Sequence, residues 1–445
     1  MIFLQNKTVI ITGAGFSAPA NLPIQNRILQ EMVETDSSVQ DFLDVNIEGE
    51  SIKFLVAYIN VALYLLKEYA NVSVEEYSEL YDDLISRFWG REKVINIIEY
   101  IMSGNHAKNA EEKNFNLIDV RDDLVKKFYL EDYDYYYNLL YIKDGLREQL
   151  GSSDIKVSLE DVFTLFDKCI NQKEHILNYT YSEIDKLQHS VLRLFTYYFS
   201  KRVNEHNYDN LDYLEAINYI VKNKNRISLI TTNWDTLLEE YLSRNNIQYN
   251  YKFNSAYVLD EDGEIFDKEL LDNRKISYIK LHGSINWFRC LSCGTLQIYN
   301  TDSCGNYLFD DEKKERCLKC GRISDGEKVQ IKPEIITPTM IKSITGQLYN
   351  NLWQNAAYEL QQAKKIIFCG YSLPMADYEF RYLLKKNIQT NTEIDVVLYH
   401  DDDPKRSCET QMTDFLPEKR YSDLFPNNRC NFFYEGFGEY FKFNN

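Results

Sequence analysis

Residues 8–26 read TVIITGAGFSAPANLPIQN, and at the centre of this stretch are Gly13-Ala14-Gly15-Phe16-Ser17. The β-branched run Val9-Ile10-Ile11-Thr12 predicts a buried strand. The two glycines that follow let the backbone turn tightly and approach a ligand without a Cβ in the way. If a helix begins near Ala18, its free N–H groups and dipole would face an anion held by the loop. The stretch therefore predicts a phosphate-binding turn.

Two other interpretations of these residues stay open. Gly13, Gly15 and Ala18 also satisfy the G-x-G-x-x-G/A pattern with which ordinary dehydrogenases bind a dinucleotide, and Glu31 or Glu34 lies at about the right distance to serve it. A tight turn that binds nothing would use the same glycines. The dehydrogenase interpretation leaves the later motifs of the chain unexplained.

The composition is that of an ordinary globular protein. With 445 residues, 44% of them hydrophobic, the chain can form one large core or two and has the length of roughly two to three domains. Its net charge of −18 argues against direct binding of nucleic acid or of an anionic membrane, which both need basic surface. The most apolar segment, residues 54–66, is too short to span a bilayer.

The N-terminus runs directly into the first strand and shows no export signal. The nine cysteines are therefore expected to be thiols and metal ligands in a reducing cytoplasm.

From Gln25 to about Arg226, apolar residues recur at three-to-four spacing, which predicts helices. His106, His175, His189 and His206 lie in this region without ligand-like neighbours, so we interpret them as surface or hydrogen-bonded histidines. The acidic, tyrosine-rich residues 132–141 are expected to form the outer face of a helix, or a surface that binds a partner. The separate helices expected here are Ile52–Tyr69, Leu80–Phe88, Val94–Met102, Leu159–Cys169 and Ile184–Phe199.

A second buried strand is predicted at Ile227–Thr231. The polar loop Thr232-Asn233-Trp234-Asp235 follows it, and then an amphipathic helix over Thr236–Ser243. Polar residues after a parallel strand are typical of a site at the carboxyl edge of the sheet. Asn and Asp also form turns and cap helices, so a purely structural role for this loop stays open.

Three more strands predict the same arrangement. Ile276–Leu281 leads to His282-Gly283-Ser284, Lys365–Cys369 leads to Gly370-Tyr371-Ser372-Leu373, and Ile394–Tyr399 leads to His400 and an acidic loop. Five strands that each deliver a polar loop on the same side imply one shared crevice.

Two C-x-x-C pairs, Cys290/Cys293 and Cys317/Cys320, lie with 23 residues between them. Four thiolates at about this spacing predict a closed, tetrahedral zinc site that folds the segment and leaves no ligand position for catalysis. Cys304 lies between the pairs as a substitute ligand or a spare thiol. The cysteines at positions 169, 369, 408 and 430 are scattered and fit core thiols.

The motifs GAGFS, TTNWD, KLHGS, the paired C-x-x-C and GYSL, in this order, resemble the sirtuin family of NAD-dependent enzymes. The resemblance implies an α/β fold with a Rossmann-like parallel sheet, helices on both faces and a small zinc ribbon. It implies that His282 is the general base and that Asn233, with Thr232 and Asp235, lies at the nicotinamide side. The residues that would bind the rest of NAD are Gly13, Ala14, Gly15, Ser17, Gly370 and Ser372.

Three departures from the deacylases of this family are visible. Pro23 is followed by Ile24-Gln25-Asn26 where they carry Asp-Phe-Arg, and Thr232 stands where they carry Gln. In place of their peptide-clamping strand, which ends in Phe-Gly-Glu, this chain has residues 333–338, PEIITP. With the long helical segment, these departures resemble the sirtuin-like NAD hydrolases of bacterial antiviral systems, which deplete cellular NAD.

That resemblance implies cleavage of NAD to nicotinamide and ADP-ribose, or to a cyclised product. It also implies a homo-oligomer or a partner defence protein, such as an ATPase or a nucleic-acid-sensing subunit. A protein deacylase and a non-catalytic NAD-sensing scaffold remain alternatives. The expected domains are residues 1–34 with 227–445 for NAD binding, 35–226 as a helical insertion and 288–325 as the zinc ribbon.

Overall fold

The protein forms two compact units in a computed structural model. One unit holds residues 1–24, 195–337 and 342–445, and the other holds residues 25–194 and 338–341. In this division residues 195–226 belong to the unit that contains the main sheet. The structure describes residues 7–22, 159–175, 180–253, 256–259, 275–299, 317, 319–320, 331–337, 339, 347–374, 377–398 and 417–445.

The main sheet has seven strands, all parallel, in the order β11-β10-β9-β1-β2-β5-β3. All five strands expected from the sequence are present, so the α/β fold class is confirmed. The two outermost strands were not expected, because one has two residues and the other lacks a continuous apolar run. The strands are β1 Lys7–Thr12, β2 Ile227–Thr231, β3 Tyr249–Asn250, β5 Ile276–Lys280, β9 Ala363–Cys369, β10 Glu393–Val397 and β11 Cys430–Phe433.

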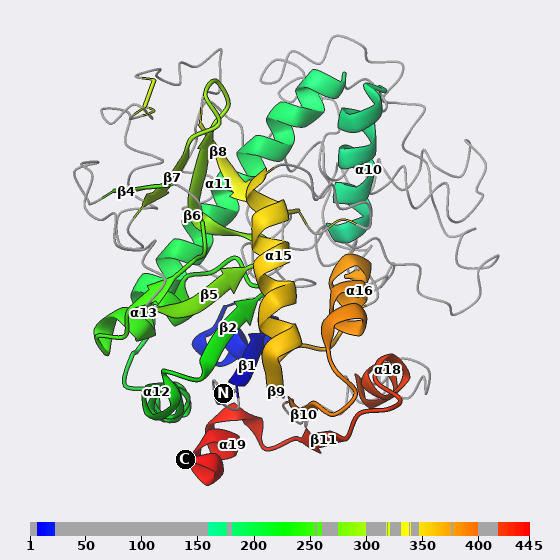
Figure 1. The fold of residues 1–445 in the computed structure, drawn as a ribbon. Helices are drawn as coiled ribbons and strands as arrows, with labels where there is room; N and C mark the ends of the chain where they lie inside the picture. Colours follow the sequence, from blue (N-terminus) through cyan, green and yellow to red (C-terminus); the bar gives the residue numbers. More distant parts are fainter. Residues whose placement is uncertain are drawn as a thin grey trace, which may run out of the picture. The chain divides into compact units, whose positions relative to one another are not determined.

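Helices flank this sheet (Figure 1). β2 and β5 are buried along their whole length, as expected of central strands of a parallel sheet covered on both faces. α15 (Gln347–Gln362) lies along one face and contacts β1 and β5. α12 (Leu211–Asn223) packs on α19 (Gly436–Asn444). Three further helices of this unit are α13 Leu237–Arg244, α16 Tyr378–Asn387 and α18 Pro417–Leu424.

The Gly13–Ser17 turn differs from the expected one. Helix α1 begins at Ala14 and ends at Ser17, and a single 3-10 turn, η1 (Ala18–Ala20), follows it. The α-helix thus begins four residues before Ala18, and only a 3-10 turn begins at Ala18 itself. Phe16 explains the earlier start, because its ring is buried 4.7 Å from the ring of Phe437 and 5.3 Å from that of Tyr213, which anchors this turn to α19 and α12.

The glycines of this turn pack against a second loop. The N–H of Gly13 donates to the carbonyl of Cys369 at 3.1 Å, and that of Gly15 donates to the carbonyl of Gly370 at 2.8 Å. A Cβ on Gly15 would lie 2.9 Å from the Cα of Gly370. The small size of these glycines therefore permits the close approach of another loop, and their expected role in binding a ligand stays a prediction. Gly370 itself has φ +61°.

A second, four-stranded sheet has the order β4-β7-β6-β8. β6 begins directly after the loop at His282, pairs antiparallel with β7 and β8, and carries Arg289, which binds Glu334 of β8 through two hydrogen bonds of 2.6 and 2.8 Å. The strands are β4 Tyr257–Leu259, β6 Gly283–Cys290, β7 Leu296–Tyr299 and β8 Ile331–Ile335.

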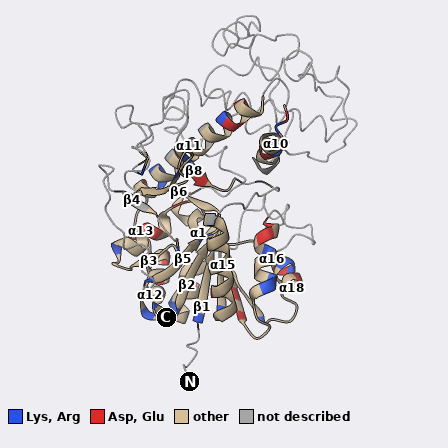
Figure 2. Ribbon diagram, turned by 45° about the horizontal axis from the view of Figure 1, so that its top comes forward, with Lys and Arg blue, Asp and Glu red and all other residues tan. Residues whose placement is uncertain are grey.

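Two predicted helices of the long helical region are confirmed, as α10 (Leu159–Gln172) and α11 (Tyr181–Glu205). α11 begins with a capping box, in which Thr180 and Glu183 each bind the backbone N–H of the other. The three helices expected between residues 52 and 102, and residues 132–141, lie outside the described residues. On the described helices Lys and Arg are interspersed with Asp and Glu (Figure 2), and none of these helices is long and apolar enough to cross a membrane.

We predict that Gly370→Ala destabilises the protein far more than Gly294→Ala. Both glycines have positive φ, +61° and +70°, so alanine at either position costs about 1–2 kcal/mol in backbone strain. At Gly370 the new Cβ would also lie 2.1 Å from the N of Phe16, whereas no described atom lies within 4 Å at Gly294. Urea unfolding should show a loss above about 4 kcal/mol, or no folded protein, for Gly370→Ala. Equal losses would contradict the packing of the two loops.

Candidate functional site

Four strands that are neighbours in the sheet, β9, β1, β2 and β5, end at the same edge. Because all four are parallel, the loops that follow them meet there. These loops carry the GAGFS, TTNWD, HGS and GYSL residues singled out in the sequence. The expectation that the polar loops lie on the same side of the sheet is therefore confirmed for four of the five strands, and His400, expected after the fifth, lies outside the described residues.

Ser17, Asn233 and Asp235 form a continuous chain of hydrogen bonds across two of these loops. The Nδ2 of Asn233 donates to the carbonyl of Gly13 at 2.9 Å and to the Oγ of Ser17 at 3.0 Å. The hydroxyl of Ser17 in turn donates to the Oδ2 of Asp235 at 2.8 Å. Below this chain, the hydroxyl of Thr12 donates to that of Thr231 at 2.8 Å. The carboxamide of Asn233 is thus held in one orientation.

Asp235 has the structural role in the turn before the helix that the sequence left open for the TTNWD loop. Its Oδ1 accepts the N–H of Leu237, the first residue of α13, at 3.1 Å. Its other oxygen is the one that binds Ser17. One buried carboxylate therefore shapes the start of the helix and orients the serine of the neighbouring loop.

The other predicted binding residues lie along the same edge. Ala14 begins α1, and the N–H of Thr232 donates to the carbonyl of Thr12 at 3.2 Å. Gly370 packs against the Gly13 turn, and the side chain of Ser372 is exposed two residues further on. Of this group, Ser372 offers the most accessible side chain.

His282 is buried and faces a carboxylate that was not predicted from the sequence. Its Nε2 lies 3.8 Å from the Oδ1 of Asp377, the residue just before α16. The Oδ2 of Asp377 accepts the hydroxyl of Tyr371 at 2.8 Å. Burial, together with the charge of Asp377, raises the pKa of Tyr371, so the phenol stays protonated and remains the donor.

A buried ion pair beneath the TTNWD loop was also missed. The Nζ of Lys280 lies 2.7 Å from the Oε1 of Glu239 and 2.5 Å from the carbonyl oxygen of Asp235. The hydroxyls of Tyr251 and Tyr278 donate to the two oxygens of Glu239. Burial raises the pKa of Glu239, and Lys280 opposes this shift. A lysine at the end of an otherwise apolar strand was the available signal in the sequence.

The four predicted zinc ligands come together. The Sγ atoms of Cys290, Cys293, Cys317 and Cys320 all lie within 4.8 Å of one another. Two of the sulfur pairs are 3.5 and 3.7 Å apart. A tetrahedron with Zn–S bonds of about 2.3 Å has sulfur–sulfur edges of about 3.8 Å, so these residues fit zinc.

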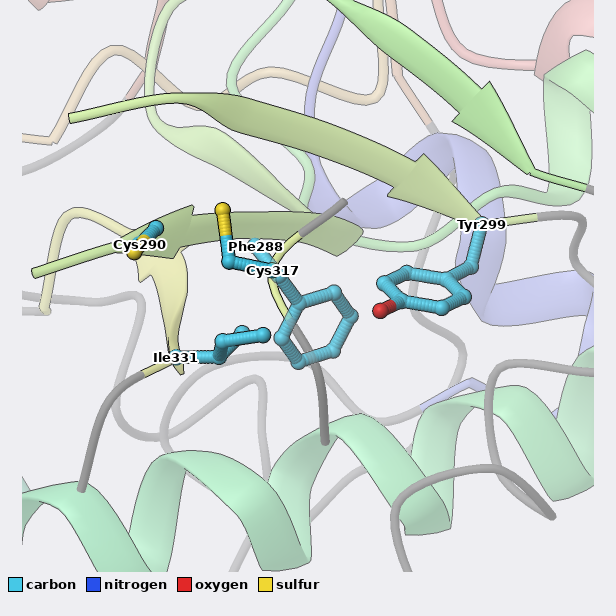
Figure 3. Close-up of a cluster of buried hydrophobic side chains, with 5 residues drawn as sticks. All are labelled: Phe288, Cys290, Tyr299, Cys317 and Ile331. Atoms are coloured by element: carbon cyan, nitrogen blue, oxygen red, sulfur yellow. The ribbon is translucent and has the colours of Figure 1, made fainter. Parts of the chain in front are cut away.

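The surroundings of the cysteine cluster also suit a structural metal. Cys290 ends β6, and a tight turn closed by the Gly294 N–H to the Cys290 carbonyl brings Cys293 alongside. Hydrogen bonding to Thr295 lowers the pKa of Cys293 to about 6, which favours the thiolate. Figure 3 shows two of the cysteines packed in one apolar cluster, made up of Phe288, Cys290, Tyr299, Cys317 and Ile331.

The expected roles are confirmed for two cysteines and two histidines, and His189 is buried and not at the surface. Cys169 and Cys369 are buried thiols, and burial raises the pKa of both. His206 has a hydrogen-bond partner, the hydroxyl of Tyr241 at 2.8 Å, and His175 is exposed. Cys304, Cys408 and His106 lie outside the described residues.

Comparison with known families gives a match for the part of the chain that carries most of these loops. A family model described as SIR2-like domain matches residues 227–414. This part of the chain is a SIR2-like domain. The match begins at the first residue of β2, includes the four cysteines and the loops with Asn233, His282 and Gly370, and leaves out the Gly13 turn. It supports an NAD-dependent activity in general terms.

The chain is also similar to solved structures. Sir2Tm bound to a propionylated peptide is 15% identical over 58% of this chain and 79% of its own, with a TM-score of 0.32. A Sir2 homologue mutant in complex with ADP-ribose is 18% identical over 58% of this chain and 74% of its own, also with a TM-score of 0.32. A structure concerned with the mechanism and regulation of Sir2 enzymes is 12% identical over 99% of this chain and 91% of its own, with a TM-score of 0.30. No curated relative matches the chain.

We predict one zinc ion per chain, lost when Cys290 and Cys317 are both changed to serine. Removing one thiolate from each pair leaves two sulfur ligands, too few for a closed tetrahedral site. Cys430→Ser is the matched control, because this half-buried thiol lies on β11, outside the cluster. Metal analysis of purified proteins should give about one zinc for wild type and control and none for the double variant. Full zinc content in the double variant would exclude the assignment.

Proposed function

We propose that the protein is an NAD hydrolase that cleaves the nicotinamide glycosidic bond to give nicotinamide and ADP-ribose. The observation that carries the proposal is the convergence of Ser17, Asn233 and Asp235 in one hydrogen-bonded chain at the sheet edge where His282 also lies. The SIR2-like match over residues 227–414 supports NAD as the substrate. Nicotinamide is a good leaving group, so cleavage passes through an oxocarbenium-like state, as in glycoside hydrolysis.

Asn233 is suited to bind the attacking water or a ribose hydroxyl. Its Nδ2 already donates to Gly13 and Ser17, which leaves Oδ1 as the atom of the carboxamide for an incoming donor. Because both hydrogen bonds fix the orientation, the acceptor is held in place before the substrate arrives, and this preorganisation lowers the cost of reaching the transition state.

His282 is proposed as the group that takes up the proton. Imidazole titrates near neutral pH, so it can accept a proton from water as the new C–O bond forms. The backbone of His282 is held on the second sheet, where its carbonyl accepts the N–H of Ile336 at 2.9 Å. The ring is therefore presented from a fixed position.

The edge strand β8 favours hydrolysis over peptide deacylation. β8, residues 331–335, lies at the edge of the four-stranded sheet and overlaps the segment 333–338 that replaces the family's peptide-clamping strand. Pro333 lies within this strand, opposite Phe288 of β6, and proline in an edge strand is expected with its nitrogen on the open side. Proline has no N–H to donate, and a peptide that added to this edge would lose that hydrogen bond. Pro338 lies outside the described residues.

The two remaining alternatives have less support. The dehydrogenase interpretation rests on the first glycine motif alone and leaves the loops with Asn233 and His282 unexplained. Glu31 and Glu34 lie outside the described residues. A non-catalytic NAD-sensing module would keep the same residues but would release no nicotinamide.

We predict that the purified protein, or its activated assembly, releases nicotinamide from NAD without any acylated peptide. A positioned general base contributes a factor of about 10² to 10⁴ in rate, so His282→Ala should lose about that much. Asn233→Ala should lose a similar factor while zinc stays bound. Ser372→Ala, which changes an exposed hydroxyl at the same edge, is expected to alter the NAD affinity more than the rate. Chromatography of the products measures nicotinamide, ADP-ribose and any cyclised form.

If nicotinamide appears only with an acylated peptide, and in equal amount to deacylated product, the protein is a deacylase instead. Binding of NAD without release of nicotinamide under any condition would support the sensing alternative.

We further propose that this activity depletes NAD in antiviral defence and is held low until a partner or self-assembly activates it. The proposal rests on the resemblance and on a helical insertion of nearly 200 residues, expected at 35–226, which the NAD chemistry does not need. An unregulated NAD hydrolase would poison its own cell.

We predict that the protein forms a homo-oligomer, or a complex with a defence partner, and that its basal rate rises on assembly. Size-exclusion chromatography with light scattering, run in parallel with the nicotinamide assay over a range of protein concentrations, measures both. A strict monomer with full activity at the lowest concentration would count against this regulation.

A further inference from the structure

Asp377 directly precedes helix α16, a position where an aspartate usually accepts hydrogen bonds from the first-turn N–H groups. Its side chain makes no such cap. Instead, Oδ2 accepts the hydroxyl of Tyr371 at 2.8 Å and Oδ1 lies 3.8 Å from the Nε2 of His282. The ordinary structural reason for an aspartate at this position is therefore missing.

The burial of this group adds to the argument. Asp377 and His282 are each only 7% exposed. A buried carboxylate loses most of its hydration and needs a donor or a positive charge nearby to persist. Tyr371 supplies the donor, and the imidazole of His282 is placed to supply the charge when it takes up a proton.

The groups on both sides of the carboxylate are fixed. Tyr371 is 3% exposed, and its carbonyl accepts the hydroxyl of Tyr421 at 2.7 Å. On the other side, the carbonyl of His282 accepts the N–H of Ile336 at 2.9 Å. Asp377 therefore lies between a locked phenol and a histidine whose backbone is held in place.

We propose that Asp377 is a positioning residue that orients the imidazole of His282 and stabilises its protonated form, with Tyr371 holding the carboxylate. The inference rests on the proposed hydrolase function. In that reaction the C–N bond breaks and its electron pair leaves with nicotinamide. Water attacks the anomeric carbon, and one of its protons passes to His282. Asp377 takes no proton and keeps its negative charge beside the imidazolium.

The first test compares Asp377→Asn with Glu379→Gln, which removes a negative charge from the first turn of the same helix. The asparagine keeps an acceptor for Tyr371 but loses the charge next to His282. We expect kcat for nicotinamide release to fall about 10- to 100-fold in Asp377→Asn, less than on loss of the base itself. The Kd for NAD, measured by calorimetry, and the melting temperature should stay close to wild type. Glu379→Gln should behave as wild type throughout.

A double-variant cycle separates positioning from a structural effect. If Asp377 acts through His282, adding Asp377→Asn to His282→Ala should lower kcat no further. A further loss of the same size in that background would overturn the proposal, as would a single variant with wild-type kcat.

A second readout does not depend on turnover. In protein labelled with ¹⁵N-histidine, six histidines contribute signals, and those of His282 are identified by their disappearance in His282→Ala. At one fixed pH the ring nitrogens of His282 should shift in Asp377→Asn and not in Glu379→Gln. Unchanged shifts in both would overturn the proposal. If the wild type releases no nicotinamide, the hydrolase function fails, and these shifts still decide whether Asp377 acts on His282.

Discussion

The ion pair between Lys280 and Glu239 supports the loops at the carboxyl edge of the main sheet. Lys280 is the last residue of β5 and is fully buried, and Glu239 comes from the first turn of α13. The ammonium group also donates to the carbonyl of Asp235, so one cation joins a strand, a helix and the TTNWD loop between them. Loss of one partner would leave the other charge buried, which typically costs about 3–5 kcal/mol.

The half-buried Asn233 loop is held by contacts on several sides. The carbonyl of Trp234 accepts the N–H of Ile285 and the hydroxyl of Ser284, so the loop is held from the second sheet as well. Asn233 then reaches across to Gly13 and Ser17. Residues far apart in the sequence thus form one hydrogen-bonded network, and its polar side chains, more than the backbone of the glycine turn, define the candidate site.

The cysteine cluster is connected to this site through β6 and β8. β6 begins one residue after His282 and ends at Cys290, and the N–H of Ile336, just past the end of β8, holds the carbonyl of His282. A metal bound by the four cysteines would fix the far end of the same pair of strands. Such a metal would keep the second sheet, and with it His282, in place.

The sequence by itself determined the five main strands, the order of the polar loops and the two cysteine pairs, because each depends on residues close together in the chain. It could not show that Gly13 and Gly15 serve contact with Gly370, since that contact joins residues more than 350 positions apart. The roles of Glu239 and Asp377 were equally hidden from the sequence. An acidic residue in the first turn of an amphipathic helix is expected to face solvent, and one just before a helix is expected to cap it. Only the tertiary structure buries these carboxylates, one against Lys280 and the other between Tyr371 and His282, and burial is what turns an ordinary charge into a constraint on the site.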